Sequence, residues 1–341
     1  MQRLGVRLEP RRPDLTLAHG PLMACGFLGA LIALERAVAC GARWTFAAPL
    51  LLAAGALALV PDWARLAGGL MIAGSLALVG AYGVILRRRA AAEIGIMTAG
   101  AVALLLGNIF WAAGVMIPLM VYWWAAFLLL TIFGERLELS WLRRSSRLRT
   151  TLAWLAVAVY GAGVGLAAPH PVRGMRLAGA GMLALALWLL VYDRVGPQLA
   201  RGGLARYIGA NLGCGQLWLL ISAGLWTRYA GALYYHYDAL LHSLFLGFVM
   251  TMVFAHAPII FPAISGRPLR WSRWFYLPAA LLQVSLAGRI AADLAHPTPV
   301  PLWQLAGLLN IVALLLFLAT VAVSARAGKK QAGASPLSAA G

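Results

Sequence analysis

Two histidines, His19 and His242, lie in stretches of sequence that are apolar enough to cross a bilayer. An ionisable side chain at membrane depth costs free energy and usually faces a bundle interior, a cavity or a bound group. Imidazole is also the most common metal-binding side chain, and two imidazoles from different helices can occupy both axial positions of a haem iron. The pair therefore predicts a haem site. The alternative is that each ring only hydrogen-bonds a neighbouring helix.

The composition predicts a polytopic membrane protein. Of the 341 residues, 62% are hydrophobic and 11% are charged, and the mean hydropathy is +0.83. Soluble domains are far more polar, and the apolar runs do not alternate as the strands of a membrane barrel would. We expect an all-α helical bundle with about eleven transmembrane helices, since each needs roughly 20 apolar residues. Their expected ranges are 15–39, 44–60, 64–86, 94–116, 118–140, 150–168, 174–193, 204–226, 232–257, 274–292 and 301–324.

The charge distribution predicts the orientation of the chain. The net charge of +18 comes mainly from arginines in every second loop, so the bilayer and not nucleic acid is the expected partner. The positive-inside rule places those loops in the cytoplasm, the N-terminus outside and the C-terminus inside, although four arginines in the N-terminal tail oppose this orientation. Without a secretory signal, the chain is expected in a bacterial-type inner membrane. We expect one transmembrane domain over 1–341, with a polar tail at 1–14, the bundle at 15–324 and a flexible tail at 325–341.

The depths of the histidines separate their roles. His19 lies near the outer end of its span, and His242 lies about two turns inward of His236, so His19 and His242 can meet in the outer half. His236, among tyrosines, is expected at the membrane interface and is a weaker metal candidate. His256 is 14 residues beyond His242, about 21 Å along a helix, and cannot bind the same iron. We expect a second cofactor or a proton relay at His256, or a neutral, hydrogen-bonded ring.

Acidic and basic residues also lie near the inner ends of two spans. Glu35 and Arg36 end the first span, and Glu135, Arg136 and Glu138 end the span at 118–140. Such residues are well placed for ion pairs between helices, which relieve the cost of charge at membrane depth. We expect a network that holds the two helices together. It is either a structural clamp or part of a proton path.

Two further arginines are candidates for haem contacts. Arg289 and Arg228 lie near the outer ends of their spans, and a guanidinium matches a propionate carboxylate in bidentate fashion. No CxxCH sequence is present for covalent attachment, so the expected cofactor is a b-type haem. The three cysteines are expected to be buried thiols. Several amides within the spans could form hydrogen bonds between helices or line a water path: Asn108, Asn211, Gln216, Gln283 and Asn310.

Two of these segments resemble known membrane haem proteins. Ala18-His19-Gly20-Pro21-Leu22-Met23 resembles the His-Gly-x-x-Met opening of the second helix of the haem-copper oxidase catalytic subunit, and the segment 235–254 resembles its tenth helix. A closer resemblance is to the NnrS family of haem- and copper-associated membrane proteins, through Gly26-Phe27 after His19 and Gly266-Arg267-Pro268-Leu269 after His242. The resemblance implies a twelve-helix core that lacks its first helix.

The resemblance also implies a function. It implies a b-type haem with His19 and His242 as axial ligands, acting in nitric oxide metabolism or in electron transfer from a quinol or a small redox protein. Whether the protein is also an enzyme, a haem-dependent oxidoreductase similar to nitric oxide reductase, is left open by the resemblance. A conventional copper centre is not expected, because the spans 118–140 and 150–168 contain no histidine. The alternative is a transporter or a structural membrane protein without a redox cofactor, but no pair of interrupted helices in inverted halves supports it.

Overall fold

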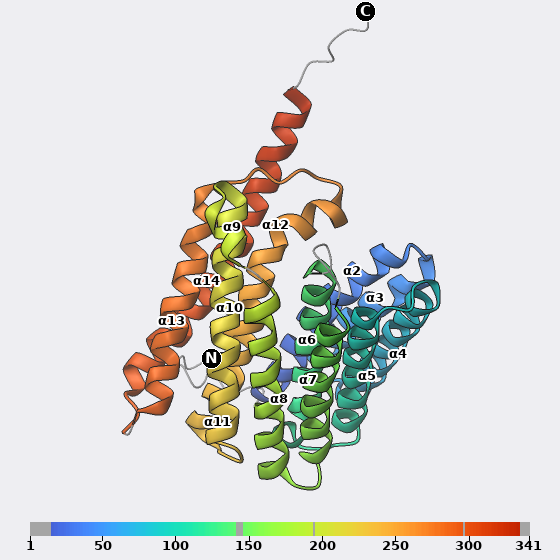
Figure 1. Cartoon of the computed structure of the whole chain (residues 1–341), viewed down its shortest axis with the longest axis vertical. Helices are drawn as coiled ribbons and strands as arrows, with labels where there is room; N and C mark the ends of the chain where they lie inside the picture. Colours follow the sequence, from blue (N-terminus) through green and yellow to red (C-terminus); the bar gives the residue numbers. More distant parts are fainter. Residues whose placement is uncertain (1–14, 141–145, 194, 296, 335–341) are drawn as a thin grey trace, which may run out of the picture. The chain divides into compact units, whose positions relative to one another are not determined.

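The computed structural model describes residues 15–140, 146–193, 195–295 and 297–334, and among them it contains helices and no strand (Figure 1). The predicted all-α bundle is therefore confirmed. Within these ranges, ten helices are long and apolar enough to cross a membrane. The eleventh expected span, 44–60, is a shorter apolar helix, Arg43–Leu59. The protein is a multi-pass membrane protein whose outer surface contacts the lipid bilayer.

The chain divides into two compact units. The first contains Met1–Asp193 and Leu219–Leu233, and the second contains Arg194–Trp218 and Tyr234–Gly341. The helix α10 (Gly203–Arg228) contributes its two ends to different units. His19 belongs to the first unit and His242 to the second.

Helices in the first unit pack mostly against their neighbours in sequence. The pairs α3–α4, α4–α5, α5–α6 and α7–α8 make the main contacts, as expected for antiparallel helices joined by short loops. The helix α6 is the most buried of them, and Trp124, Phe127 and Phe133 on it are fully buried. The elements are α1 (Leu15–Pro21), η2 (Leu22–Gly29), α2 (Ala30–Cys40), η3 (Arg43–Phe46), α3 (Ala47–Leu59), α4 (Ala64–Arg88), α5 (Ala92–Ala112), α6 (Ile117–Ser140), α7 (Arg147–Leu166) and α8 (Pro171–Tyr192).

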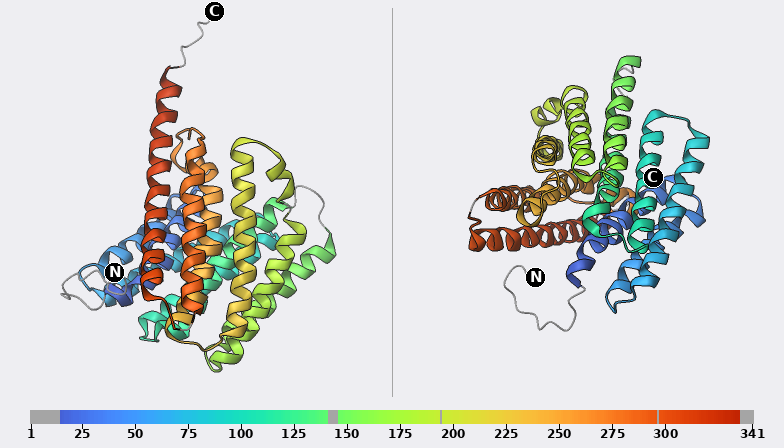
Figure 2. Two further views of the ribbon diagram at one scale, coloured as in Figure 1. Left: turned by 90° about the vertical axis from the view of Figure 1, so that its left-hand side faces the viewer. Right: turned by 90° about the horizontal axis from the view of Figure 1, so that it is seen from below.

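The second unit is built around two long helices that lie side by side, α13 and α14 (Figure 2). The helix α11 and the following segment pack on α13, and Phe254 stacks on Phe317 with ring centroids 3.8 Å apart. Its elements are α9 (Gly196–Ala200), part of α10, α11 (Tyr234–His242), η5 (Ser243–Met250), α12 (Thr251–Ser265), η6 (Arg273–Phe275), α13 (Tyr276–Leu294) and α14 (Val300–Ala334).

The end of α14 differs from the prediction. A flexible tail was expected from residue 325, but the helix continues to Ala334. The sequence past the apolar stretch contains alanine, arginine and lysine, which favour a helix without needing burial. Apolarity marks the end of the span and not the end of the helix.

Glycines set the close packing of α7 on α8. A Cβ atom at Gly163 would collide with the backbone of Ala178, and one at Gly181 would collide with the backbone of Tyr160. Small residues allow helices to approach closely in membranes, where packing replaces the hydrophobic effect as the main force between helices. Gly161 and Gly165, on the same helix as Gly163, have open space around the position of a Cβ atom.

This difference gives a prediction for α7. Gly163→Ala should lower the free energy of unfolding by about 1–3 kcal/mol, because the helices must separate to admit the methyl group. Gly161→Ala and Gly165→Ala should be neutral or stabilising by up to about 1 kcal/mol, because alanine favours the helix. Thermal unfolding of the three variants in one detergent measures the difference. Equal changes in all three would contradict the packing of α7 on α8.

Candidate functional site

His242 is the last residue of α11, in the second unit. Its Nδ1 atom lies 3.0 Å from the backbone carbonyl oxygen of Asp238 and 3.4 Å from the Asp238 carboxylate. Since a carbonyl oxygen only accepts hydrogen bonds, Nδ1 carries the proton and Nε2 is the basic nitrogen of the ring. The side chain is 19% exposed, so the imidazole is held in a fixed orientation within an apolar helix.

Arg289 on α13 binds the same aspartate. Its Nε lies 2.8 Å from one carboxylate oxygen of Asp238 and its Nη2 lies 3.1 Å from the other. The guanidinium also lies over the ring of Trp303, 5.3 Å from the centroid. The arginine that was predicted to bind a haem propionate therefore forms a bidentate ion pair that supports His242 through Asp238.

A second aspartate lies beside this group. Asp293 is four residues beyond Arg289 on α13 and is 1% exposed. Neither of its carboxylate oxygens, nor the indole nitrogen of Trp303, has a hydrogen-bond partner among the described residues. The sequence analysis missed both Asp238 and Asp293. The signal that could have found them is an acidic residue within an apolar span, four residues from a histidine or an arginine.

Both histidine-bearing helices contain a π-helical segment. Three residues after His19, η2 runs from Leu22 to Gly29, and directly after His242, η5 runs from Ser243 to Met250. The π-helix is rare and often occurs at functional sites. A glycine in each segment allows a close contact, Gly26 against Ala56 and Gly247 against Trp218. The two units therefore share an unusual backbone next to the predicted ligands.

His19 lies on α1 and is exposed. The adjacent Gly20 packs this helix on α6, because a Cβ atom there would lie 3.3 Å from the ring of Trp124. The imidazole is thus accessible from outside the first unit.

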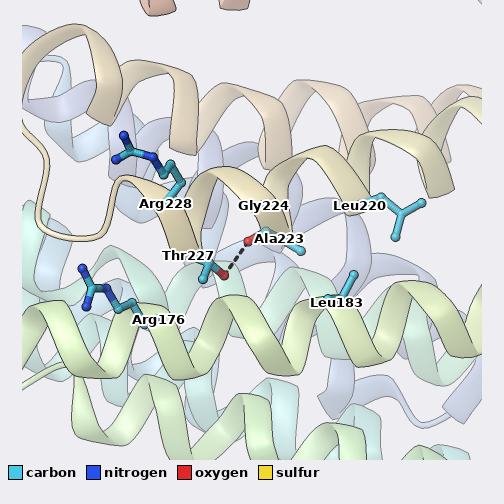
Figure 3. A pocket seen from close by; sticks show the side chains of 7 residues that line it. All are labelled: Arg176, Leu183, Leu220, Ala223, Gly224, Thr227 and Arg228. Carbon is cyan, nitrogen blue, oxygen red and sulfur yellow. Dashed lines mark hydrogen bonds between the residues drawn. The ribbon is translucent and has the colours of Figure 1, made fainter.

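Arg228 lines an open pocket in the first unit, with a volume of about 660 Å³ (Figure 3). Arg176 of α8 lies at the same end of the pocket as Arg228, and apolar residues such as Leu183 and Leu220 line the rest. The hydroxyl of Thr227 donates a hydrogen bond to the carbonyl of Ala223 on the same helix. Two cations beside an apolar groove suit an amphiphile with an acidic head group.

The other predicted metal ligands do not gather around His242. His236 and His256 are both half-buried, and the Nδ1 of His256 lies 2.7 Å from the carbonyl oxygen of Met252. In the described part of the chain, no three histidine, cysteine, aspartate or glutamate side chains lie close enough to hold a metal ion. A second cofactor at His256 and a two-ligand haem iron both stay predictions.

The predicted ion pair between spans is present in the first unit. Arg36 Nη2 on α2 lies 2.5 Å from Glu35 Oε1 and 3.1 Å from Glu135 Oε1 on α6. The three side chains are 12–24% exposed. The contact of Arg36 with Glu135 joins the ends of the two helices as expected.

Arg136 forms an ion pair that was not predicted. Arg136 forms a bidentate pair with Asp193 at the end of α8, with Nε 2.7 Å from Oδ2 and Nη2 2.5 Å from Oδ1. Glu138 accepts from Arg89, which also binds Glu93. Successive residues of a helix point in different directions, so Glu135 and Arg136 reach different neighbours.

The amides within the spans mostly join helices. Asn108 accepts from Cys25 and from the indole of Trp124, and it donates to Ser75. In the second unit, Gln283 bridges Trp218 and Thr251, and Asn310 accepts from Ser285. Asn211 instead donates to the carbonyl of Tyr207 on its own helix. These bonds favour the structural alternative over a continuous water path.

The chain belongs to the family described as Domain of unknown function (DUF8744), whose match covers residues 1–326. Neither the curated proteins nor the solved structures give a match to the chain.

The geometry replaces the expected coupling of Arg136 with Glu35. Arg136→Ala should lower the free energy of unfolding by about 3–5 kcal/mol, because it leaves the buried Asp193 carboxylate without its partner. In a double-mutant cycle, Asp193→Ala should add much less once Arg136 is gone. In the control pair, the effects of Arg136→Ala and Glu35→Gln on the free energy of unfolding should be nearly additive. Coupling to Glu35 but not to Asp193, measured by thermal unfolding, would contradict this arrangement.

Proposed function

We propose that the protein is a membrane haem protein that transfers electrons, with His242 and His19 as the axial ligands of a b-type haem. The observation that carries the proposal is the support of His242. Metal-binding histidines almost always donate their second ring N–H to a carbonyl or a carboxylate, which fixes the tautomer and the ring orientation. The bond from His242 to the Asp238 carbonyl, beside an aspartate that is itself held by Arg289, fits this pattern.

The assignment of His19 rests on different evidence. Its sequence context resembles a haem-binding helix, and the charge pattern predicts a depth in the membrane similar to that of His242. Two features of the first unit support it, namely the exposed imidazole and the π-helical segment that follows. The candidates for binding the haem are therefore His242 and His19, with Arg228 as the remaining candidate for a propionate.

Two imidazole ligands favour a role in electron transfer over catalysis on a gas such as nitric oxide. A haem iron with two imidazole ligands exchanges single electrons with its partners, and a molecule such as nitric oxide could bind only if one imidazole left the iron. A quinol or a small redox protein would be the electron donor. A role in nitric oxide metabolism through electron supply is compatible with this proposal, as is a place in a bacterial-type inner membrane with the N-terminus outside.

Absorption spectra of the purified protein and its variants test this proposal. The parent should show a low-spin spectrum, and His19→Ala and His242→Ala should each lose it, because one imidazole no longer reaches the iron. His242→Met should keep the haem, since a thioether can also serve as an axial ligand, and should raise the reduction potential. His170→Ala is the matched control, because this exposed histidine lies in a turn before α8.

For a valid comparison, each variant must elute from size-exclusion chromatography as a folded protein in the same detergent. Full haem content in both alanine variants, or equal loss in His170→Ala, would reject the two histidines as ligands.

A further inference from the structure

Two arginines in the first unit are each shared by two glutamates. Arg36 uses one nitrogen, Nη2, to contact both Glu35 and Glu135, so the two carboxyl groups lie next to each other. When two carboxylates share a site with one positive charge, one of them favours the protonated form. The pair therefore resembles a site built to hold one proton.

The second arginine repeats the arrangement. Arg89 contacts Glu93 at 2.7 Å and Glu138 at 3.1 Å. Glu135 and Glu138 are three residues apart on α6 and lie on the same face of that helix. We call these six side chains, Arg36, Arg89, Glu35, Glu93, Glu135 and Glu138, the glutamate cluster. It carries four acidic groups and two basic ones.

Exposure differs within the cluster. Arg89 and Glu138 are 58% and 38% exposed, whereas Glu35, Glu135 and Arg36 are 24%, 17% and 12% exposed. Glu93, which pairs with the exposed Arg89, is only 2% exposed. Thr131, four residues before Glu135 on α6, is fully buried. The cluster is thus open at Arg89 and Glu138 and closed within the bundle.

The closed end contains polar atoms without partners. Tyr82 on α4 is fully buried, close to Thr131 and within reach of the charges of Arg36 and Glu135. Within the described ranges, four buried atoms of this region have no hydrogen-bond partner: Arg36 Nε, Tyr82 Oη, Glu93 Oε2 and Thr131 Oγ1. Leaving such groups unsatisfied costs free energy. Water within the cluster would satisfy them, because it both accepts from a donor such as Arg36 Nε and donates to an acceptor such as Glu93 Oε2.

We propose that the glutamate cluster is a proton-binding site that loads from its open end. A hydronium ion at Glu138 gives its proton to a carboxylate and leaves as water. The proton is then held by Glu35 or Glu135, one of which becomes a neutral carboxylic acid beside Arg36. No electron is transferred, and the site does not depend on the proposed haem.

The surroundings favour a proton over a larger ion. The charged and titratable groups around Glu135 are Glu35 and Arg36 from α2, Tyr82 from α4, and Arg136 and Glu138 from α6. Arg136 is itself paired with Asp193, and Glu138 is paired with Arg89, which also binds Glu93. The two guanidinium groups oppose a metal cation, and the four carboxyl groups oppose an anion. A proton on a carboxyl group needs no coordination shell.

Along α4, the polar groups do not continue directly beyond Tyr82. The next buried polar side chain on this helix is Ser75, seven residues before Tyr82, which corresponds to about 10 Å along the helix. The fully buried Leu78 lies between them. This spacing supports loading of the proposed site from the side of Arg89 and Glu138.

A carbodiimide tests for the protonated carboxyl group. Dicyclohexylcarbodiimide adds to a carboxylic acid in an apolar setting and leaves a stable acylurea that mass spectrometry locates. We expect the adduct on Glu135 or Glu35 of the full chain in detergent, and its rate should fall roughly tenfold per pH unit above the titration midpoint. Asp193 is the internal control, because it is also buried but forms a bidentate ion pair with Arg136. Equal labelling of Asp193, or protection of the cluster by sodium ions, would overturn the proposal.

Infrared spectra give a second test that does not depend on the reagent. The parent should show the carbonyl band of a protonated carboxyl group, and Glu135→Gln should lose it while keeping the fold, since glutamine is neutral and of equal size. Glu35→Gln gives the same test from the other carboxyl group should Glu135→Gln not fold. Glu138→Gln, at the open end, should keep the band. A parent without the band, or glutamine variants that retain it in full, would show that the cluster binds no proton.

Discussion

Each charged side chain inside these apolar helices must find an opposite charge nearby, because an unpaired charge at membrane depth is too costly. This constraint adds specific contacts to the packing of particular helices. Arg36 joins α2 to α6, Arg136 joins α6 to the end of α8, and Arg289 joins α13 to α11. In the second unit, the same pairing holds Asp238 in place, and Asp238 orients His242. The candidate ligand therefore owes its orientation to an ion pair.

The charges do not balance everywhere. Glu35, Glu93, Glu135 and Glu138 outnumber the two arginines between them. Asp293 is buried beside the His242 group without a hydrogen bond from any described residue. Replacing buried charged groups with apolar side chains of similar volume often costs little stability. The excess of carboxyl groups is therefore the basis of the proposed proton-binding site.

The sequence predicts the spans well, because length and apolarity alone define a membrane helix. It also predicts the contact between Arg36 and Glu135, since both lie at the same end of their spans. It does not predict that Arg136 binds Asp193, because the choice among several acidic residues depends on the rotation of α6. Neither hydropathy nor charge pattern predicts the π-helical segments. The helix α14 extends past its apolar stretch, because alanine and lysine favour a helix without burial.

Electron paramagnetic resonance of the oxidised protein, grown with isotope-labelled histidine, tests the central claim most directly. The hyperfine spectrum reports which nitrogen atoms are bound to the iron. A low-spin signal with coupling to two labelled imidazole nitrogens, reduced to one labelled imidazole when His242 is replaced by methionine, is the predicted result. A folded protein without iron, or a haem whose signal is unchanged by replacement of His242, would contradict the account.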